Sequence, residues 1–197
     1  MRGDALTTAL RLGPALCHGD AMRLFAAIRP PQNVIDHLAV ALADAQSFAP
    51  DLRWVEPGQW HITLAFYGEQ PSGALEDIAA QLANVAAESK PHRLHLRGCG
   101  TFGGRTLWIG LGGTDLRKLM AAAELDDVDP GRQRAHLTVA RAPRQVGVAK
   151  DLARALTVYT GPEWTATELE LVESVLGAGR GGRPLHDTCR RFRLGTC

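Results

Sequence analysis

Two short segments of the chain share a histidine that is followed two residues later by a threonine. Residues 61–64 read His-Ile-Thr-Leu, and residues 136–139 read His-Leu-Thr-Val. Both lie in stretches whose pattern predicts a β-strand, in which residues i and i+2 point to the same face. Each segment therefore presents one imidazole and one hydroxyl on a polar face. Two such strands packed together would line one cleft with these four side chains.

A cleft with two imidazoles and two hydroxyls suits the cleavage of a phosphodiester. Histidine titrates near neutral pH, so one ring can take a proton from an attacking water while the other protonates the departing oxygen. Thr63 and Thr138 can donate hydrogen bonds to the non-bridging phosphate oxygens. Arg141, which lies five positions after His136, can neutralise the charge that spreads over them. The segment 130–145 holds four arginines and no acidic residue, which predicts a local anion-binding patch.

Other interpretations of the same residues must be weighed. A single His-x-Thr in a strand is more often a structural feature than a catalytic one, and the repeat of both residue types in the same register is what favours function. A metal hydrolase is disfavoured, because His92 and His95 would point to opposite faces of a strand and the chain has no His-Glu-x-x-His motif. We therefore expect a site without metal or cofactor.

Composition bounds the class of protein. The chain has 197 residues, of which 45% are hydrophobic and 22% charged, and its formal net charge is +1. These values predict one globular domain, or two small lobes, and exclude a strong field that would draw the whole protein to nucleic acid or membrane. None of the four cysteines forms a Cys-x-x-Cys pair, so we expect reduced thiols in a cytoplasmic protein: Cys17, Cys99, Cys189 and Cys197.

The ends of the chain carry no clear targeting signal. No apolar run approaches the length of a membrane helix, and residues 1–21 do not have the layout of a signal peptide. We interpret residues 1–21 as a disordered N-terminal extension and residues 22–197 as a single domain. No predicted helix has an unexplained second apolar face, so a monomer is expected.

Hydrophobic periodicity predicts alternating strands and helices around the two motifs. Strands are expected at 22–28, 60–67, 92–100, 106–111, 135–142, 168–174 and 185–194, and helices at 34–45, 75–86, 116–123 and 148–159. Each His-x-Thr strand is followed by a helix, which gives the chain a faint internal repeat. The pattern therefore predicts an α+β fold with helices outside a sheet.

These features resemble the two-histidine phosphoesterase superfamily, and within it the RNA 2′,3′-cyclic phosphodiesterases that were once described as 2′-5′ RNA ligases. The resemblance runs from Met22 to about Leu194. Besides the two motifs it rests on Met-Arg-Leu-Phe-Ala-Ala-Ile at 22–28 with the prolines that follow, and on Leu-Trp-Ile-Gly at 107–110. Further matching segments are 53–55, 59–69, 98–103 and 173–176.

The resemblance implies a bilobal, pseudo-symmetric fold in which two antiparallel sheets line a central groove, with helices outside. It implies metal-independent hydrolysis of a terminal 2′,3′-cyclic phosphate of RNA to a 2′-phosphate. By the same resemblance His61 would be the proton donor to the leaving 3′ oxygen and His136 the acceptor that activates water. Thr63, Thr138 and Arg141 would hold the phosphate.

Some features leave the substrate open. The span 111–134 is shorter than is usual in the family, Ala135 stands where proline is common, and His186 stands where tyrosine is common. Phe66 and Phe102 are candidates for stacking on a nucleobase. The alternatives are 2′-5′ ligation of RNA ends as the reverse reaction, opening of another small cyclic nucleotide, and a non-catalytic module that binds phosphate or RNA ends.

Overall fold

The computed structural model describes residues 21–195, except residues 127 and 143–145. The predicted extension therefore lies outside the described residues apart from Ala21, and so do Cys17 and Cys197. The described elements are β1 (Ala21–Ile28), α1 (Gln32–Phe48), β2 (Arg53–Trp54), β3 (Ile62–Pro71), α2 (Ala74–Glu88), β4 (His92–Phe102), β5 (Thr106–Gly113), α3 (Arg117–Ala123), β6 (His136–Arg141), α4 (Val146–Ala155), β7 (Thr160–Ala166), β8 (Glu168–Val175) and β9 (Leu185–Arg193). Short 3₁₀ turns precede both motifs, at Pro57–Gln59 and Pro130–Arg132.

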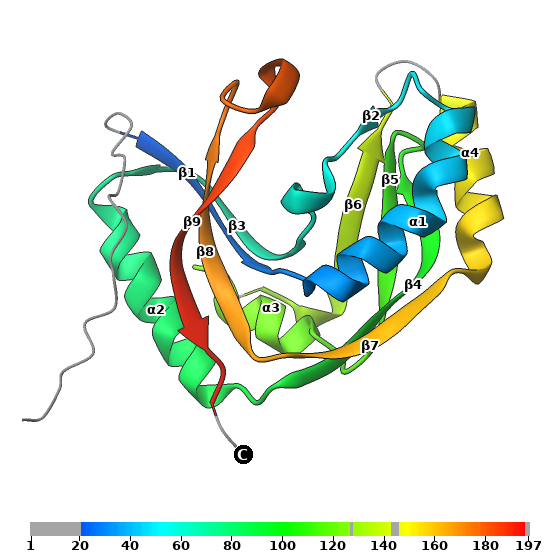
Figure 1. Ribbon diagram of the computed structural model, residues 1–197. Helices are drawn as coiled ribbons and strands as arrows, with labels where there is room; N and C mark the ends of the chain where they lie inside the picture. Colours follow the sequence, from blue (N-terminus) through cyan, green and yellow to red (C-terminus); the bar gives the residue numbers. More distant parts are fainter. Residues whose placement is uncertain (1–20, 127, 143–145, 196–197) are drawn as a thin grey trace, which may run out of the picture.

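All the described strands belong to one curled antiparallel sheet with the order β7-β4-β5-β6-β3-β1-β8-β9, and β2 adds to β6. One half contains β7, β4, β5 and β6, and the other contains β3, β1, β8 and β9. Between β3 and β6 a single registered pair, Ile62 with Leu137, joins the halves in the described part of the chain. The two predicted sheets are thus the two halves of one sheet that curls around the space between them (Figure 1).

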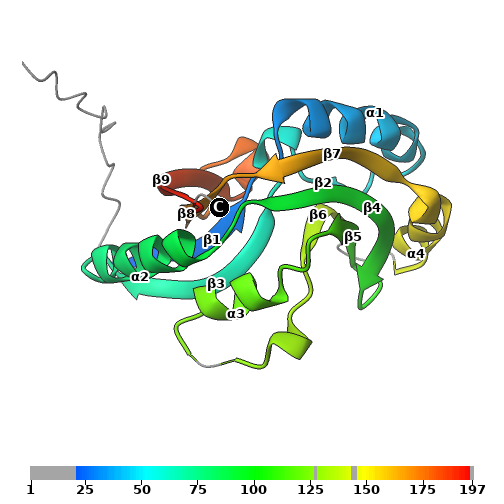
Figure 2. The same ribbon diagram turned by 90° about the horizontal axis from the view of Figure 1, so that it is seen from below.

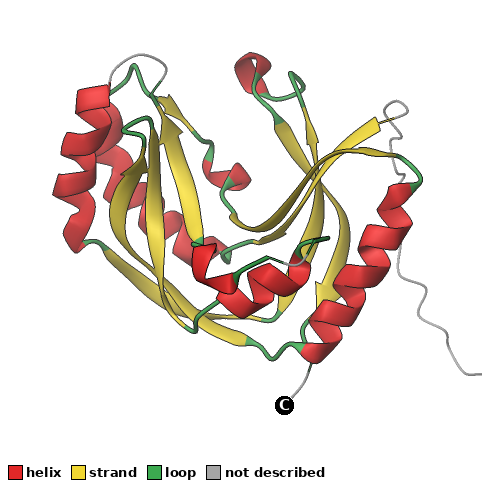
Figure 3. Ribbon diagram, turned by 180° about the vertical axis from the view of Figure 1, so that it is seen from behind, coloured by secondary structure: helices red, strands yellow, loops and turns green. Residues whose placement is uncertain are grey.

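The helices lie outside the curl, as predicted for this α+β fold. α4 packs against β4 and β5, and α1 packs against β7, so both cover the same half of the sheet (Figures 1 and 3). α2 covers the other half, and α3 lies below the junction of the two halves, against β3 and α2 (Figure 2). Among the described helices, none is long and apolar enough to cross a membrane.

β1 is central to the core because both of its faces are buried. Leu24, Ala26 and Ile28 point into the main core under the helices, whereas Phe25 and Ala27 form a second, smaller cluster with Val172 on the concave side of the sheet. A continuous apolar run is the pattern expected of such a doubly buried strand. In α1 the predicted stripe is buried as an amphipathic helix requires, with Val34, Leu38, Leu42 and Ala45 facing inward.

Two strands were not expected from the sequence. β7 contains Gly161 and Pro162, which depress strand propensity, and its end position in the sheet order explains why a proline is tolerated there. β2 is only two residues long, too short for any alternation to appear. His61 lies one residue before β3 instead of inside the strand predicted at 60–67.

Candidate active site

A β-bulge in β6 aligns the residues of the second motif. Thr138 and Ala140 pair with consecutive residues of β5, so Val139 has no partner of its own there. A bulge of this kind shifts the alternation of side chains by one position. Arg141 consequently lies on the same face as His136 and Thr138, although the spacing of an unbroken strand would send it to the opposite face.

The first motif contains the same bulge at the corresponding residue. Thr63 and Ala65 pair with consecutive residues of β1, and Leu64 is the skipped residue. Phe66 therefore shares the face of His61 and Thr63, in the position that the arginine takes in the second motif. The repeat seen in the sequence thus extends to an irregularity of the backbone, which periodicity alone could not have revealed.

The junction of the two halves brings the motifs together. Ile62 and Leu137, which directly follow the two histidines, are the registered pair between β3 and β6. Because the pairing is antiparallel, each histidine is set toward the threonine of the other motif. Both paired side chains are fully buried, so the histidines and threonines occupy the opposite, groove-facing side.

Both imidazoles are held in the same tautomer. Nδ1 of His61 lies 2.8 Å from the carbonyl oxygen of Gln59, and Nδ1 of His136 lies 2.8 Å from that of Arg134. A carbonyl oxygen only accepts, so Nδ1 must carry the hydrogen in each ring. Nε2 is therefore the nitrogen that each histidine has available for gaining or giving a proton.

His61 is enclosed by aromatic rings. Its ring centroid lies 4.8 Å from that of Phe25 and 5.0 Å from that of His186. Burial lowers the pKa of His61 from 6.5 to about 4; the hydrogen bond to the backbone carbonyl opposes this, while the nearby His186, Arg29 and His136 lower the pKa further. His61 is accordingly neutral in the free protein at neutral pH.

Arg29 braces the turn that carries His61. Its Nε donates to Glu170 at 2.7 Å, Nη1 donates to the carbonyl of Gly58 at 3.1 Å, and Nη2 donates to the carbonyl of His186 at 3.4 Å. Gln59 adds a second link, because its Oε1 accepts from the backbone N–H of His186 at 2.8 Å. The backbone before His61 is thus fixed to β1, β8 and β9 together.

Glu170 neutralises the positive charge of Arg29. Its side chain is only 4% exposed. Burial alone would raise the pKa of the Glu170 carboxyl, but hydrogen bonds from Arg29, Thr188 and Arg191 outweigh burial and lower the pKa. The carboxylate is therefore charged, and it offsets the cation that lies beside His61.

His136 has a different environment. The Phe102 ring meets it edge-on at 4.8 Å, and the Trp108 ring lies 6.3 Å away. The guanidinium of Arg134 covers Trp108 at 4.3 Å. Gly100 is required here, because a Cβ at that position would lie 2.3 Å from the Trp108 indole.

The groups proposed for phosphate binding are available to a ligand. Thr63 and Thr138 are partly buried, and among the described residues neither hydroxyl has a protein hydrogen-bond partner. The charge of Arg141 acts on His186, which lies on β9 in the other half of the sheet. Burial is the main cause that lowers the pKa of His186, and the charges of Arg29 and then Arg141 lower that pKa further.

The pairing of the strands places the predicted site residues on one face of the sheet. The two phenylalanines among them differ in their exposure to solvent. Phe102 contacts His136 directly and is 39% exposed. Phe66 is 50% exposed, but Arg23 lies 4.9 Å above its ring. Sequence reasoning missed the roles of Phe25, Arg29 and Glu170. The one signal in the sequence that could have indicated such a role is Arg29, a charged residue that directly follows a buried apolar strand.

Within the described residues, no group of three or more His, Cys, Asp or Glu side chains could hold a metal ion. His92 and His95 lie on β4, and the two ring nitrogens of His92 are buried without hydrogen-bond partners there. Burial lowers the pKa of His92, as expected for a histidine enclosed by the fold.

Comparison with known proteins shows which families the chain resembles. The model of the family "LigT like Phosphoesterase" matches residues 28–108, a range that includes the first motif. A curated relative from Geobacillus stearothermophilus, named RNA 2′,3′-cyclic phosphodiesterase, is 37% identical over 136 residues, which is 61% of this chain and 43% of that protein. The chain thus matches less than half the length of that relative. An Archaeoglobus fulgidus protein of the same name is 27% identical over 79% of this chain and 92% of its own.

The fold agrees with these matches. A crystal structure of a Thermus thermophilus protein superposes with a TM-score of 0.70 at 26% identity, covering 88% of this chain and 98% of that one. The chain is thus similar to the LigT-like phosphoesterases, in sequence over part of its length and in fold over most of it.

Proposed function

We propose that the protein is an RNA 2′,3′-cyclic phosphodiesterase, which hydrolyses a terminal 2′,3′-cyclic phosphate to a 2′-phosphate without a metal ion. The observation that carries the proposal is the pair of imidazoles with Nδ1 engaged by a carbonyl. Two rings that each keep Nε2 available can serve a reaction that needs one proton acceptor and one proton donor. The names of the curated relatives support the substrate class.

In the proposed mechanism His136 Nε2 removes a proton from a water molecule as its oxygen attacks phosphorus. The bond between phosphorus and the 3′ oxygen breaks, and His61 Nε2 gives its proton to that oxygen. One proton is taken from water and one is delivered to the leaving group, so the reaction is balanced. Thr63, Thr138 and Arg141 bind the non-bridging oxygens, where negative charge increases in the transition state.

The lowered pKa of His61 bears on its role as donor. A pKa of about 4 leaves the ring neutral in the free protein. A bound cyclic phosphate is an anion, and an anion close to the ring favours its charged form. Substrate binding therefore raises the pKa of His61, so the proton that is donated is taken up with the substrate. His136, whose neighbours include the exposed Phe102, acts as the acceptor.

The rest of the proposal concerns the whole chain. Phe66 and Phe102 are proposed to stack on the terminal base, since both are partly exposed on the groove face. A monomer is proposed on the helix pattern of the sequence, in which no predicted helix has an unexplained second apolar face. We propose that residues 22–197 act as one unit, and that the protein works in the cytoplasm, where the free thiols of Cys99 and Cys189 stay reduced.

The test is turnover of a nucleoside 2′,3′-cyclic phosphate and of a short RNA with the same end, with a chelator present and the product followed by phosphorus NMR. Only the 2′-phosphate is expected. His61→Ala and His136→Ala should each lower kcat by about 10²–10⁴-fold. His37→Ala is the matched control, because His37 is exposed on α1 and its ring contacts Tyr159.

Other outcomes identify the alternatives. Inhibition by the chelator or formation of a 3′-phosphate would contradict the proposal. Joining of RNA ends to a 2′-5′ linkage would favour the ligase alternative. RNA binding without turnover, unaffected by either histidine variant, would favour a non-catalytic module.

A further inference from the structure

A cavity of about 500 Å³ lies beside His136, outside the set of residues assigned to the reaction. Its lining includes Ala135, which precedes His136, and Trp108, whose ring lies 6.3 Å from the imidazole. Gly110 also lines it and is the registered partner of His136 on β5. We call this space the β5 cavity. Its size is within the range of small-molecule sites.

Glycines of β5 form part of the lining of the β5 cavity. Trp108, Gly110 and Gly112 alternate along the groove-facing side of the strand, so an indole is followed by two positions without side chains. A Cβ on Gly112 would lie 2.3 Å from the His95 ring and 2.7 Å from Cδ of Arg97. These two side chains therefore occupy the space over Gly112, and Arg97 lines the cavity from there.

The charge of the β5 cavity is positive. Arg97, Arg117 and Arg134 line it, and the acid in the lining, Asp115, is paired with Arg117 at 2.6 Å. Among the described residues, Arg97 and Arg134 have no carboxylate partner. Two guanidinium groups without counter-ions at the edge of a hollow suit a phosphate group, which a guanidinium can bind through paired hydrogen bonds.

We propose that the β5 cavity binds the phosphodiester that precedes the cyclic end of an RNA chain, which makes an oligonucleotide a better substrate than a cyclic mononucleotide. This inference rests on the proposed function. A 2′,3′-cyclic phosphate ends the chain at its 3′ side, so the next phosphate along an RNA lies one nucleotide away on the 5′ side. The β5 cavity begins at Gly110, the register partner of His136. There the guanidinium groups of Arg97 and Arg134 can bind that phosphate.

The experiment compares kcat/KM for a cyclic mononucleotide and for a dinucleotide that carries the same terminal nucleoside 2′,3′-cyclic phosphate. We expect the dinucleotide to be favoured about tenfold or more, since its additional phosphate gains charge-assisted hydrogen bonds that the mononucleotide lacks. Arg97→Gln should remove most of this preference through KM and leave turnover of the mononucleotide within about twofold. Added salt should weaken the preference as well.

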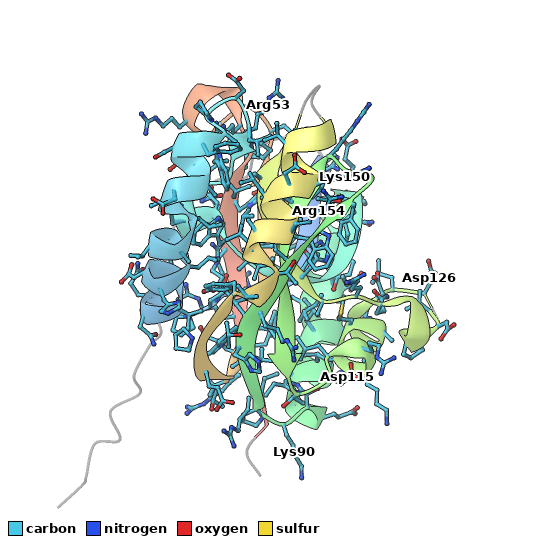
Figure 4. The ribbon with its side chains drawn as sticks, turned by 90° about the vertical axis from the view of Figure 1, so that its right-hand side faces the viewer. Arg53, Lys90, Asp115, Asp126, Lys150 and Arg154 are labelled. Carbon is cyan, nitrogen blue, oxygen red and sulfur yellow. The ribbon has the colours of Figure 1, made fainter. Side chains whose placement is uncertain are left out.

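Arg154→Gln is the matched control, because it removes the same charge from the outer surface of α4 (Figure 4). Equal kcat/KM for the two substrates, or an equal loss on both in Arg97→Gln, would overturn the inference. Binding of the product forms, a nucleoside 2′-phosphate and the dinucleotide 2′-phosphate, is measured in parallel. If neither substrate is turned over, the proposed function fails, whereas tighter binding of the dinucleotide that depends on Arg97 would still support the β5 cavity as a phosphate site.

Discussion

At each histidine of the site, a carbonyl two residues upstream decides which ring nitrogen carries the hydrogen. The rings are chemically identical, so any difference between their roles comes from their surroundings. His61 is enclosed by Phe25 and His186, and the Arg29 cation lies nearby. His136 adjoins an exposed phenylalanine. Different environments of this kind separate an acid from a base in other sites with two equivalent groups.

The enclosure of His61 predicts a pH dependence of stability. The folded protein keeps His61 neutral down to about pH 4, whereas the unfolded chain takes up the proton near its ordinary pKa of 6.5. The free energy of unfolding should therefore fall as pH decreases from 6.5 toward 4, by about 1.4 kcal/mol for each unit by which the pKa is lowered. His61→Gln should reduce this slope, measured by urea denaturation between about pH 7 and pH 4.5.

The slope should not vanish in that variant, because the pKa values of His92 and His186 are also lowered by burial. The exposed His37→Gln is the control and should keep the full slope. Identical slopes in wild type and His61→Gln would show that the His61 ring is not held neutral.

Arg141 provides a second prediction at this scale. Removing its charge by Arg141→Gln should lower kcat/KM about 10–100-fold, because a charge-assisted hydrogen bond to the phosphate is lost. Arg154→Gln is the matched control, since Arg154 is exposed on α4, where it pairs with Asp151 away from the site. Steady-state turnover of a cyclic mononucleotide measures both variants. An equal loss in the two would remove Arg141 from the site.

At the scale of elements, two devices place the reacting groups. The first device is the pair of matching bulges, which bring Phe66 and Arg141 onto the same face as the histidines. The brace from Arg29 ties the turn before His61 to three strands. The second motif has no equivalent brace in the described residues; there the Arg134 side chain packs on Trp108 instead.

The brace can be tested through stability. Arg29→Met leaves the buried Glu170 with fewer partners, and we expect a loss of roughly 2–4 kcal/mol in the free energy of unfolding, with Arg191 and Thr188 limiting the effect. The double variant Arg29→Met/Glu170→Gln should regain part of it. Arg93→Met is the control, because its pair with Glu163 is exposed and contributes less than about 1 kcal/mol. Urea denaturation measures all three, and similar losses for Arg29→Met and Arg93→Met would contradict the brace.

The sequence alone was sufficient to predict elements with a clear hydrophobic period and site residues that occur in a repeated motif. The buried run at β1, the stripe of α1 and the two His-x-Thr segments follow from local spacing. β7 was missed because Gly161 and Pro162 conceal an edge strand. Arg29 and Glu170 were missed because 141 positions separate them, and a contact of that range leaves no local pattern. The bulges were also beyond prediction, since a skipped residue is visible only in the pairing of neighbouring strands.

At the scale of the whole molecule, the two halves of the sheet meet at one registered pair but share one core. Residues from both halves and from α1, α2, α3 and α4 belong to the same buried cluster. Side chains under the helices, more than backbone hydrogen bonds, therefore fix one half against the other. The separation of the two histidines depends on that core.

We therefore predict a single cooperative unfolding transition. Leu137 is fully buried at the junction, so Leu137→Ala should lower the free energy of unfolding by about 2–5 kcal/mol. The loss should appear equally in far-ultraviolet circular dichroism and in tryptophan fluorescence. Two separate transitions would mean that the halves unfold independently.

The shared tautomer of the two rings also sets what remains after a reaction has finished. In the proposed mechanism, opening of a cyclic phosphate leaves His61 without its proton and His136 with an added one, so the pair is left in the mirror image of its starting state. That mirror image is the arrangement required for ring closure. If the proposed mechanism holds, the two histidines are ready to catalyse the reverse step immediately after each hydrolysis. Net direction then depends on how fast the product leaves and how fast solvent resets the enclosed ring beneath Phe25.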